Sequence, residues 1–473
     1  MFFNLTKTKI RMKELLWFCK TNDSSSLARI TDSLIPLLKS QFNITLLSNK
    51  TNIKDIKNVI IGEDTKSVTY IDFLKKMPGA FKNGKINDEN IRSINMKYIL
   101  IQMVDLIYDG NYDYVLICNG IYEIDWITKI LTSSPTYLTN QYSKKTKLVV
   151  WAPIDYIPSI GVIKNILKAD LFLTMTPVMK TEIENILQDQ IDKVMDDYRK
   201  GSIDSCIKDK SLDELYNCKL DWVGHGSDIT SEIKLPRQQL VEKLNKMHSD
   251  KLIMSKHQFT VNDIIILNAN NYGPLDPMCD SVENTPGTRK RLDLTIKAFL
   301  KVLETNKNIK LWIHTNLKSF FEMLAIENIL LSTFVDNIIL SNNSLTNEQL
   351  GFIYQMSNIS IQTSYAEGWS LTNLEASLYR SLQIVPDFLA TGWHYKDNRG
   401  LLIPITRKTI KNEGNLDVII GEVSIEDTAV KILEALELLK NEQELDHILT
   451  DAYDYAKSYS WSSIADKLIL ILD

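Results

Sequence analysis

Short runs rich in β-branched residues alternate with longer amphipathic stretches from one end of this 473-residue chain to the other. Parallel sheets with helices on both faces produce this order, because each helix returns the chain for the next parallel strand. A chain of this length is too long for one ordinary hydrophobic core, so two or three domains are expected, and we expect two. The pattern therefore predicts an α/β protein with two tandem Rossmann-like, doubly wound parallel-sheet domains.

In the first half, strands are expected at 14–20, 43–48, 58–62, 112–119, 147–152, 170–176 and 221–224. In the second half, strands are expected at "IIILNAN", "KLWIHTN", "NIILSN", "ISIQTS", "LQIVPD" and "GLLIPI". The spacing of Thr346 and Gln349 predicts a capping box at the start of a helix. Irregular structure is expected over 201–218 and 270–288.

The segment "WVGHGSDITSEIKLPRQQ" predicts the domain boundary, because two glycines and a polar, proline-containing stretch separate the two β/α series. We place an N-terminal domain at 1–225 and a C-terminal domain at 226–454. Ligands of doubly wound sheets bind outside the carboxyl ends of the strands, and two facing sheets form a cleft.

The charge balance argues against a nucleic-acid partner. Lys and Arg number 54 against 59 Asp and Glu, so the net charge of -5 provides no basic surface. No apolar run approaches the roughly 20 residues of a spanning helix, and no cleavable signal follows the N-terminus. Five widely spaced cysteines without a CxxC motif favour free thiols. A cytoplasmic protein is expected.

The stretch "SYAEGWSLTNLEASLYRSLQIVPDF" sets Glu367 and Glu375 where a strand turns into a helix. Unpaired N–H groups and the helix dipole favour anions at this turn. Glu375, one turn into the helix, suits the two hydroxyls of a ribose, while Glu367 faces another group of the same ligand. The alternative is that Glu375 only complements the helix dipole and Glu367 is a loop carboxylate.

A second segment, "TRKRLDLTIKAFL", places Arg289, Lys290 and Arg291 directly before an amphipathic helix. Cations at a strand–loop–helix junction can neutralise a diphosphate, arginine as a fork and lysine as a point charge. The alternative is a solvated charged face.

With these residues, the sequence resembles the GT-B retaining glycosyltransferases of family four, whose E-x7-E element commonly reads "EGFGLPNLEA". The chain has "EGWSLTNLEA", and "KRLDLTIKAF", "VGHGSD", "GLLIPI" and "SYSWSSIADKL" are similar to further family elements. Three departures stand out: Asn271 replaces a basic residue, "TNDSSS" lacks the usual glycines, and Asp155 stands where a histidine is frequent.

The resemblance implies a nucleotide-diphosphate sugar held by the C-terminal domain and an acceptor held mainly by the N-terminal one. Carried over, Glu375 binds the donor ribose and Glu367 lies beside the transferring sugar. Lys290, helped by Arg289, stabilises the leaving diphosphate, and Asp155 orients an acceptor or donor hydroxyl or caps a helix. The remaining donor-binding residues are those of the turn: Gly368, Trp369, Ser370 and Leu371. The helix in 455–473 is expected to pack back on the first domain.

The expected activity is that of a retaining hexosyltransferase acting on a glycan, glycolipid or glycoprotein acceptor. No metal is expected to be required, because Lys290 and helix ends supply charge, no DxD element suits chelation, and the six histidines are scattered. Two alternatives stay open. One is a catalytically inactive GT-B module that binds glycan or protein, and the other is a nucleotide-sugar epimerase or hydrolase.

Overall fold

A computed structural model describes most of the chain. The described residues are 11–19, 26–48, 57–60, 81–82, 85–86, 107, 112–133, 146–216, 218–227, 234–255, 258–270, 289–326, 329, 336–342, 345–413 and 416–473. Asn271, the segment "TNDSSS" up to residue 25, most of the expected irregular stretch 270–288 and part of the expected boundary segment lie outside these ranges.

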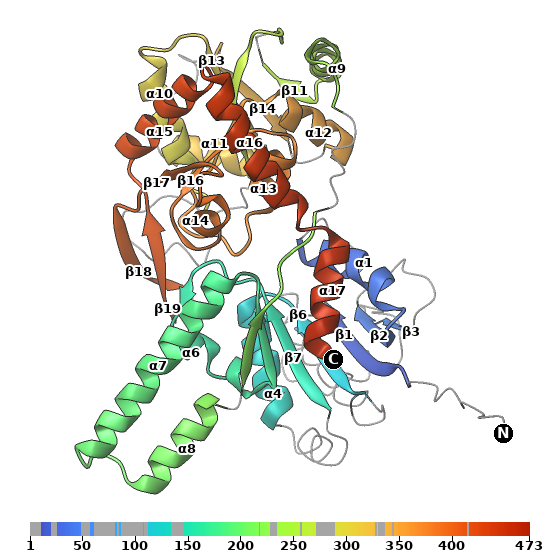
Figure 1. The fold of residues 1–473 in the computed structure, drawn as a ribbon, viewed down its shortest axis with the longest axis vertical. Coiled ribbons are helices and arrows are strands. Elements are labelled where there is room, and N and C mark those ends of the chain that lie inside the picture. The colour runs from blue at the N-terminus through green and yellow to red at the C-terminus, as the bar shows by residue number, and fades with distance from the viewer. Residues whose placement is uncertain are drawn as a thin grey trace, which may run out of the picture.

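The first unit is built on a seven-stranded parallel sheet with the order β10-β9-β7-β6-β1-β2-β3 (Figure 1). The chain forms β1 first, adds β2 and β3 on one side of it, and then adds β6, β7, β9 and β10 on the other side. The direction in which strands are added therefore reverses between β1 and β6. The strands are β1 (Lys13–Cys19), β2 (Phe42–Ser48), β3 (Lys57–Ile60), β6 (Tyr114–Cys118), β7 (Lys147–Ala152), β9 (Leu171–Thr174) and β10 (Lys219–Trp222). The helices include α1 (Ser26–Leu38), α4 (Ile121–Ser133), α6 (Ile160–Ile163) and α7 (Pro177–Arg199).

The second unit repeats this winding in a sheet with the order β11-β14-β13-β12-β15-β16-β17, in which only β11 (Ile253–Met254) is antiparallel. Here the order reverses between β12 and β15. The parallel strands are β12 (Ile264–Ala269), β13 (Ile309–Thr315), β14 (Ile338–Asn342), β15 (Ile359–Ile361), β16 (Leu382–Pro386) and β17 (Leu401–Ile403). The helices are α9 (Arg237–Ser249), α10 (Leu292–Leu303), α11 (Leu317–Ile326), α12 (Asn347–Met356), α13 (Leu371–Leu378), α14 (Leu389–Tyr395), α15 (Ile425–Leu438) and α16 (Glu442–Lys457).

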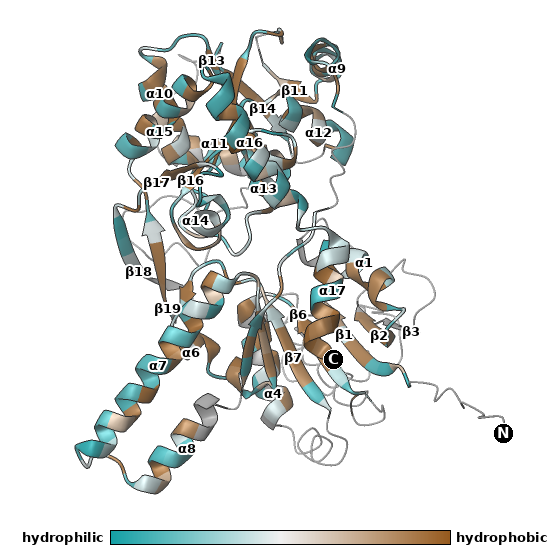
Figure 2. Ribbon diagram, in the orientation of Figure 1, coloured by the Kyte–Doolittle hydropathy of each residue, from teal (hydrophilic) through white to brown (hydrophobic). Residues whose placement is uncertain are grey.

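Each sheet is buried on both faces, which explains why its strands are nearly continuous apolar runs. Successive side chains of β1 enter different cores: Leu16 and Phe18 join one cluster, while Leu15 and Trp17 join the other. The register places Trp17 between Leu46 and Leu116 of the same cluster. Figure 2 shows hydrophobic residues concentrated in β1, β6 and β7, whereas α9 and α16 carry many hydrophilic ones.

The chain returns to the first unit through its last helix, α17 (Trp461–Leu472), which packs beside α1 (Figure 1). Its buried residues Trp461, Ile464 and Leu468 share a hydrophobic cluster with Trp17. The ammonium of Lys13 donates to the carbonyl oxygen of Leu472 at 2.9 Å. The last helix therefore packs on the first unit.

A hairpin of the second unit also reaches the first. Strands β18 (Arg407–Glu413) and β19 (Leu416–Glu422) pair antiparallel, and β19 also pairs with β8 (Ile157–Pro158). Val418 and Ile420 of this hairpin lie in the hydrophobic cluster of the first unit. The two units are thus joined by a small three-stranded sheet close to Asp155.

Two sequence expectations differ from the structure. Residues 201–218 were expected to be irregular, but they contain α8 (Ser205–Tyr216), which pairs with α7 in a projecting helical hairpin (Figure 1). The run "ISIQTS" forms a strand only to Ile361, because the polar residues that follow bond within the turn. The capping box of Thr346 and Gln349 is confirmed. In the described ranges, no helix combines the length and hydrophobicity needed to cross a bilayer.

Candidate functional site

Most of the predicted site residues gather where the strand order of the second sheet reverses, between β12 and β15. Arg289 and Lys290 precede α10, the helix after β12, and Glu367 follows β15. Ligands of doubly wound sheets bind at such a switch point, outside the carboxyl ends of the strands. Topology therefore brings the predicted cations and the predicted carboxylate to one sheet edge.

Glu367 is paired with both predicted cations. Its Oε1 lies 2.6 Å from Nζ of Lys290 and its Oε2 lies 2.9 Å from Nη1 of Arg289. The side chain of Glu367 is only 5% exposed, so these charges interact with little screening by water. The amide Nε2 of Gln362 donates to the same Oε1 at 2.6 Å. Glu367 is thus a fully bonded, buried carboxylate.

The protonation states follow from this pairing. Burial alone would raise the pKa of the Glu367 carboxyl, but the charges of Arg289 and Lys290 outweigh it and lower the pKa from 4.5 to about 2. Burial is also the main reason that the pKa of Lys290 is lowered, and the neighbouring Arg289 charge adds to this while Glu367 opposes it. Glu367 is therefore ionised at neutral pH and serves as an acceptor of hydrogen bonds.

Asp155 brings the first unit into the same cluster. It follows β7, and its Oδ1 lies 3.2 Å from Nη1 of Arg289. The same oxygen accepts the backbone N–H of Gly368 at 2.9 Å. A side chain on Gly368 would start 3.0 Å from the carbonyl oxygen of Ile154, which is tighter than most such contacts, so this close approach favours glycine. Asp155 and Gly368 thus fix the distance between the two units at the site.

The loop that carries the cations is held by its third basic residue. Arg291 forms two bonds to Asp293, of 2.9 and 2.8 Å, and a third to the hydroxyl of Tyr365. Arg291 has a left-handed backbone with φ of 42°, as does Ser370 with φ of 63° before α13. Such backbone costs about 1–3 kcal/mol for a non-glycine residue and concentrates at functional sites. Arg291 is therefore a structural residue, whereas Arg289 and Lys290 face the cluster.

Glu375 lies apart from this cluster and has different partners. Its Oε1 lies 2.9 Å from Nη1 of Arg29, which belongs to α1 of the first unit. Its Oε2 accepts the hydroxyl of Tyr354 from α12 at 3.0 Å. Neither partner was expected from the sequence, because Arg29 precedes Glu375 by 346 residues and Tyr354 is a buried tyrosine in an ordinary amphipathic helix.

The turn between the two glutamates uses its side chains for packing. Trp369 is buried against the aromatic rings of His394 and Tyr459, and Leu371 packs on the same hydrophobic cluster. The hydroxyl of Ser370 lies 2.8 Å from Oε1 of Gln362 and 2.7 Å from Oδ1 of Asn373. The side chains of Trp369 and Leu371 are thus occupied in packing. Only their backbone groups remain for the predicted contacts with a ligand.

Two of the buried histidines, His394 and His314, are neutral. Burial lowers the pKa of His394 to about 3, and its ring nitrogens contact the carbonyl of Trp369 and the hydroxyl of Tyr455. Burial likewise lowers the pKa of His314 to about 4. Across the described ranges, no group of three His, Cys, Asp or Glu residues is arranged to hold a metal ion.

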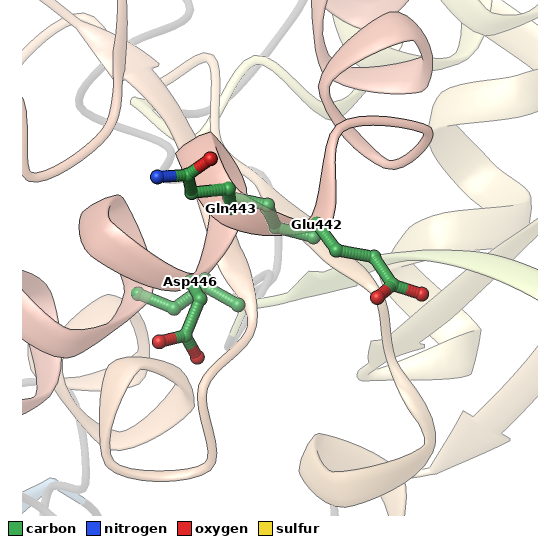
Figure 3. A pocket seen from close by; sticks show the side chains of 5 residues that line it. Glu442, Gln443 and Asp446 are labelled. Carbon is green, nitrogen blue, oxygen red and sulfur yellow. The ribbon is translucent and has the colours of Figure 1, made fainter.

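A hollow elsewhere on the second unit contains none of the predicted site residues. It lies on α16 and is lined by Glu442, Gln443, Leu445, Asp446 and Leu449 (Figure 3). All five residues belong to one helix, and no strand end or cation contributes. We therefore assign no function to it.

No family model and no curated protein matches the sequence. Solved structures do match over nearly the whole chain. A glycosyltransferase from Rickettsia africae is 13% identical with a TM-score of 0.56, covering 98% of each chain. HepE from Anabaena, solved with UDP and glucose, is 9% identical with a TM-score of 0.57, covering 97% of this chain and 99% of its own. A UDP-forming α,α-trehalose-phosphate synthase from Burkholderia vietnamiensis is 10% identical with a TM-score of 0.59, covering 98% and 99%.

The chain has the GT-B fold. The expected α/β architecture of two Rossmann-like units is therefore confirmed. Within this GT-B fold, the Arg289–Lys290–Glu367 cluster belongs to the second unit and Asp155 to the first, so the candidate site lies between them. Gln362 is a member of this cluster that was not predicted from the sequence. Its position directly after β15 was the available signal, because β15 adjoins the switch point.

Proposed function

We propose that this protein transfers a sugar from a nucleotide-diphosphate donor to a hydroxyl acceptor with retention of anomeric configuration. The observation that supports this most is the juxtaposition of Lys290 and Arg289 with Glu367 at the switch point of the second sheet, opposite Asp155 of the first. Cations beside a buried carboxylate suit a ligand that carries both phosphates and hydroxyls. The solved relative HepE binds UDP and glucose, which makes a UDP-sugar the first donor to test.

The proposed chemistry is mainly electrostatic. As the bond between the sugar and the diphosphate breaks, negative charge develops on the diphosphate and the sugar becomes oxocarbenium-like. Lys290 and Arg289 stabilise the negative charge on the diphosphate. Because their positions are fixed by the fold, they avoid the reorganisation that water molecules would require. The acceptor hydroxyl attacks from the face that the diphosphate leaves and passes its proton to the departing phosphate oxygen, so no strong general base is required. Glu367 accepts a hydrogen bond from a hydroxyl of the transferring sugar.

Diphosphate binding changes the partners of the cations. A diphosphate that reaches Lys290 and Arg289 competes with Glu367, which then exchanges its ion pairs for bonds to sugar hydroxyls. We propose that these two cations make a divalent metal unnecessary, and that the acceptor, a glycan, glycolipid or glycoprotein, binds on the side of Asp155. Unchanged turnover in excess chelator would support the first point, whereas restoration by magnesium or manganese after chelation would contradict it.

A two-step experiment tests the function. A thermal-shift screen of nucleoside diphosphates and their glucose conjugates first selects the donor, since a ligand that binds only the folded state raises the melting temperature. Product analysis by NMR with a panel of hydroxyl acceptors then follows the anomeric carbon. A new glycoside of the donor's configuration supports transfer with retention. Free sugar without any glycoside would point to a hydrolase, a changed sugar on the same nucleotide to an epimerase, and binding without turnover to an inactive module.

A further inference from the structure

The carboxylate of Glu375 is bonded by residues from both units. Tyr354 of the second unit holds one oxygen at 3.0 Å, and Arg29 of the first unit holds the other at 2.9 Å. Arg29 lies in the first turn of α1, the helix that follows β1 at the switch point of the first sheet. The ion pair thus connects the switch-point regions of the two sheets.

The two partners of Glu375 differ in how readily their side chains can move away from its carboxylate. Tyr354 is completely buried, with its ring stacked on Tyr379 at a centroid distance of 5.8 Å. The side chain of Arg29 is 34% exposed, while that of Glu375 is only 2% exposed. A ligand hydroxyl can therefore reach Glu375 only after a covering group has moved. Arg29 is the partner that can turn into solvent, where its guanidinium is rehydrated.

We infer that Arg29 controls access of the donor ribose to Glu375, so that ribose hydroxyls and the Arg29 guanidinium compete for the same carboxylate. The inference rests on the proposed function, because it takes Glu375 as the ribose acceptor. It adds a residue of the first unit to the donor site. Since Arg29 and Glu375 belong to different units, donor binding is coupled to the release of a contact between them.

This competition predicts an unusual direction of effect. Removing an arginine beside an anionic ligand normally weakens binding. Here Arg29→Ala removes a bond that exists only before the ribose binds, so it tightens nucleotide binding. We expect the dissociation constant for UDP to fall at least about fivefold, the lower end of typical coupling between two contacts.

The test measures binding of UDP and 2′-deoxy-UDP by titration calorimetry to the full chain, or of GDP and 2′-deoxy-GDP if UDP does not bind. Arg29→Ala should tighten UDP, whereas 2′-deoxy-UDP, which lacks one competing hydroxyl, should respond less. Arg29→Gln keeps a hydrogen-bond donor without the charge. It is the milder variant in case Arg29→Ala misfolds, and it should tighten UDP binding to an intermediate degree. Arg380→Ala is the matched control. Arg380 lies just after the helix that carries Glu375, and its removal breaks an ion pair with Asp446 instead of one with Glu375. In a Glu375→Gln background, Arg29→Ala should change nothing.

The outcomes separate this inference from the proposed function. If the wild-type protein binds UDP and Arg29→Ala leaves the affinity unchanged or weakens it, the competition is overturned while nucleotide binding stands. If the tightening is equal for UDP and 2′-deoxy-UDP, or persists in Glu375→Gln, the ribose is not the competitor and the inference is overturned. If neither wild type nor variant binds UDP or GDP, both proposals fall.

Discussion

The ammonium of Lys290 lies 2.6 Å from the carboxylate of Glu367, a residue 77 positions later in the chain. Both side chains are largely buried, and each follows a central strand of the same sheet. A buried pair of this kind adds little net stability, but breaking it by removing one partner is costly. The ion pair therefore contributes to both stability and the proposed function. Comparing a single variant of Lys290 with a double variant of Lys290 and Glu367 can separate the two contributions.

Lys290→Met is expected to lower both stability and turnover. Loss of one of the two cationic partners of Glu367 should cost up to about 3 kcal/mol of unfolding free energy, less than the loss of all its partners, because Arg289 remains. Loss of a charge that stabilises the leaving diphosphate should cost about 100-fold or more in kcat. Chemical denaturation and a transfer assay measure the two effects. Adding Glu367→Gln should restore much of the stability and none of the rate, whereas parallel recovery of both would assign Lys290 a purely structural role.

The folded protein should lose stability in acid through Glu367. Its pKa is about 2 in the folded protein and near 4.5 when the chain unfolds, so the unfolded state binds more protons between these values. Stability is fully present above pH 4.5 and falls as the pH drops towards 2, by up to about 3 kcal/mol in total. Melting temperatures measured between about pH 5 and pH 3 should fall less steeply in Glu367→Gln than in wild type. Glu426→Gln removes a solvent-exposed ion pair with Lys301, which water screens, so this variant should stay close to the wild-type slope.

Asp155 should matter more for turnover than for stability. Its ion pair with Arg289 is partly exposed, and such pairs contribute about 0–1 kcal/mol. Asp155→Ala should therefore leave the melting temperature nearly unchanged and reduce kcat at least about tenfold, because it removes one of the contacts that position Arg289 and the side-chain acceptor of the Gly368 amide. Asp155→Asn retains an acceptor for Gly368 and should lose less rate. Asp446→Ala, which breaks a surface pair with Arg380, controls for the loss of a carboxylate. A large drop in melting temperature with unchanged kcat would reverse this assignment.

Gly224 and Trp369 should show size complementarity where the first unit meets the turn of the site. A side chain on Gly224 would start 2.4 Å from the outer ring of the Trp369 indole. Gly224→Ala should destabilise the protein by about 1–3 kcal/mol through overpacking. Trp369→Phe removes the atoms that would clash, so the double variant should recover part of this loss. Additive losses in the double variant would show that the two residues do not limit each other.

The sequence predicted the sheets well because buried parallel strands are continuous apolar runs. Lys147–Ala152 has the predicted bounds, and β13 begins one residue earlier than expected. It did not predict the β18–β19 hairpin, because β18 is rich in charged and polar residues like a loop and β19 also pairs with β8 in the other unit. The helix Ser205–Tyr216 was missed because its apolar residues are few, and Ile207 among them remains exposed.

The site was predictable where strand order alone brings residues together. Glu367 and Lys290 follow neighbouring strands of one sheet, so their proximity required only the expected topology. Arg29 was not predictable, because its contact with Glu375 depends on how the two units are placed against each other. The packing of Trp369 into an aromatic cluster was missed for the same reason, since Gly224 and Tyr459 come from distant parts of the chain.

The most direct test is calorimetric titration of UDP and GDP into the wild-type protein and into the Lys290→Met, Glu367→Gln double variant. The variant lacks both charges of the pair, so it should fold while lacking a phosphate contact. We expect wild type to bind at least one of the two nucleotides and the variant to bind it at least about tenfold more weakly, as for loss of one charge-assisted contact. Equal affinity in both proteins, or no binding to either, would contradict the account.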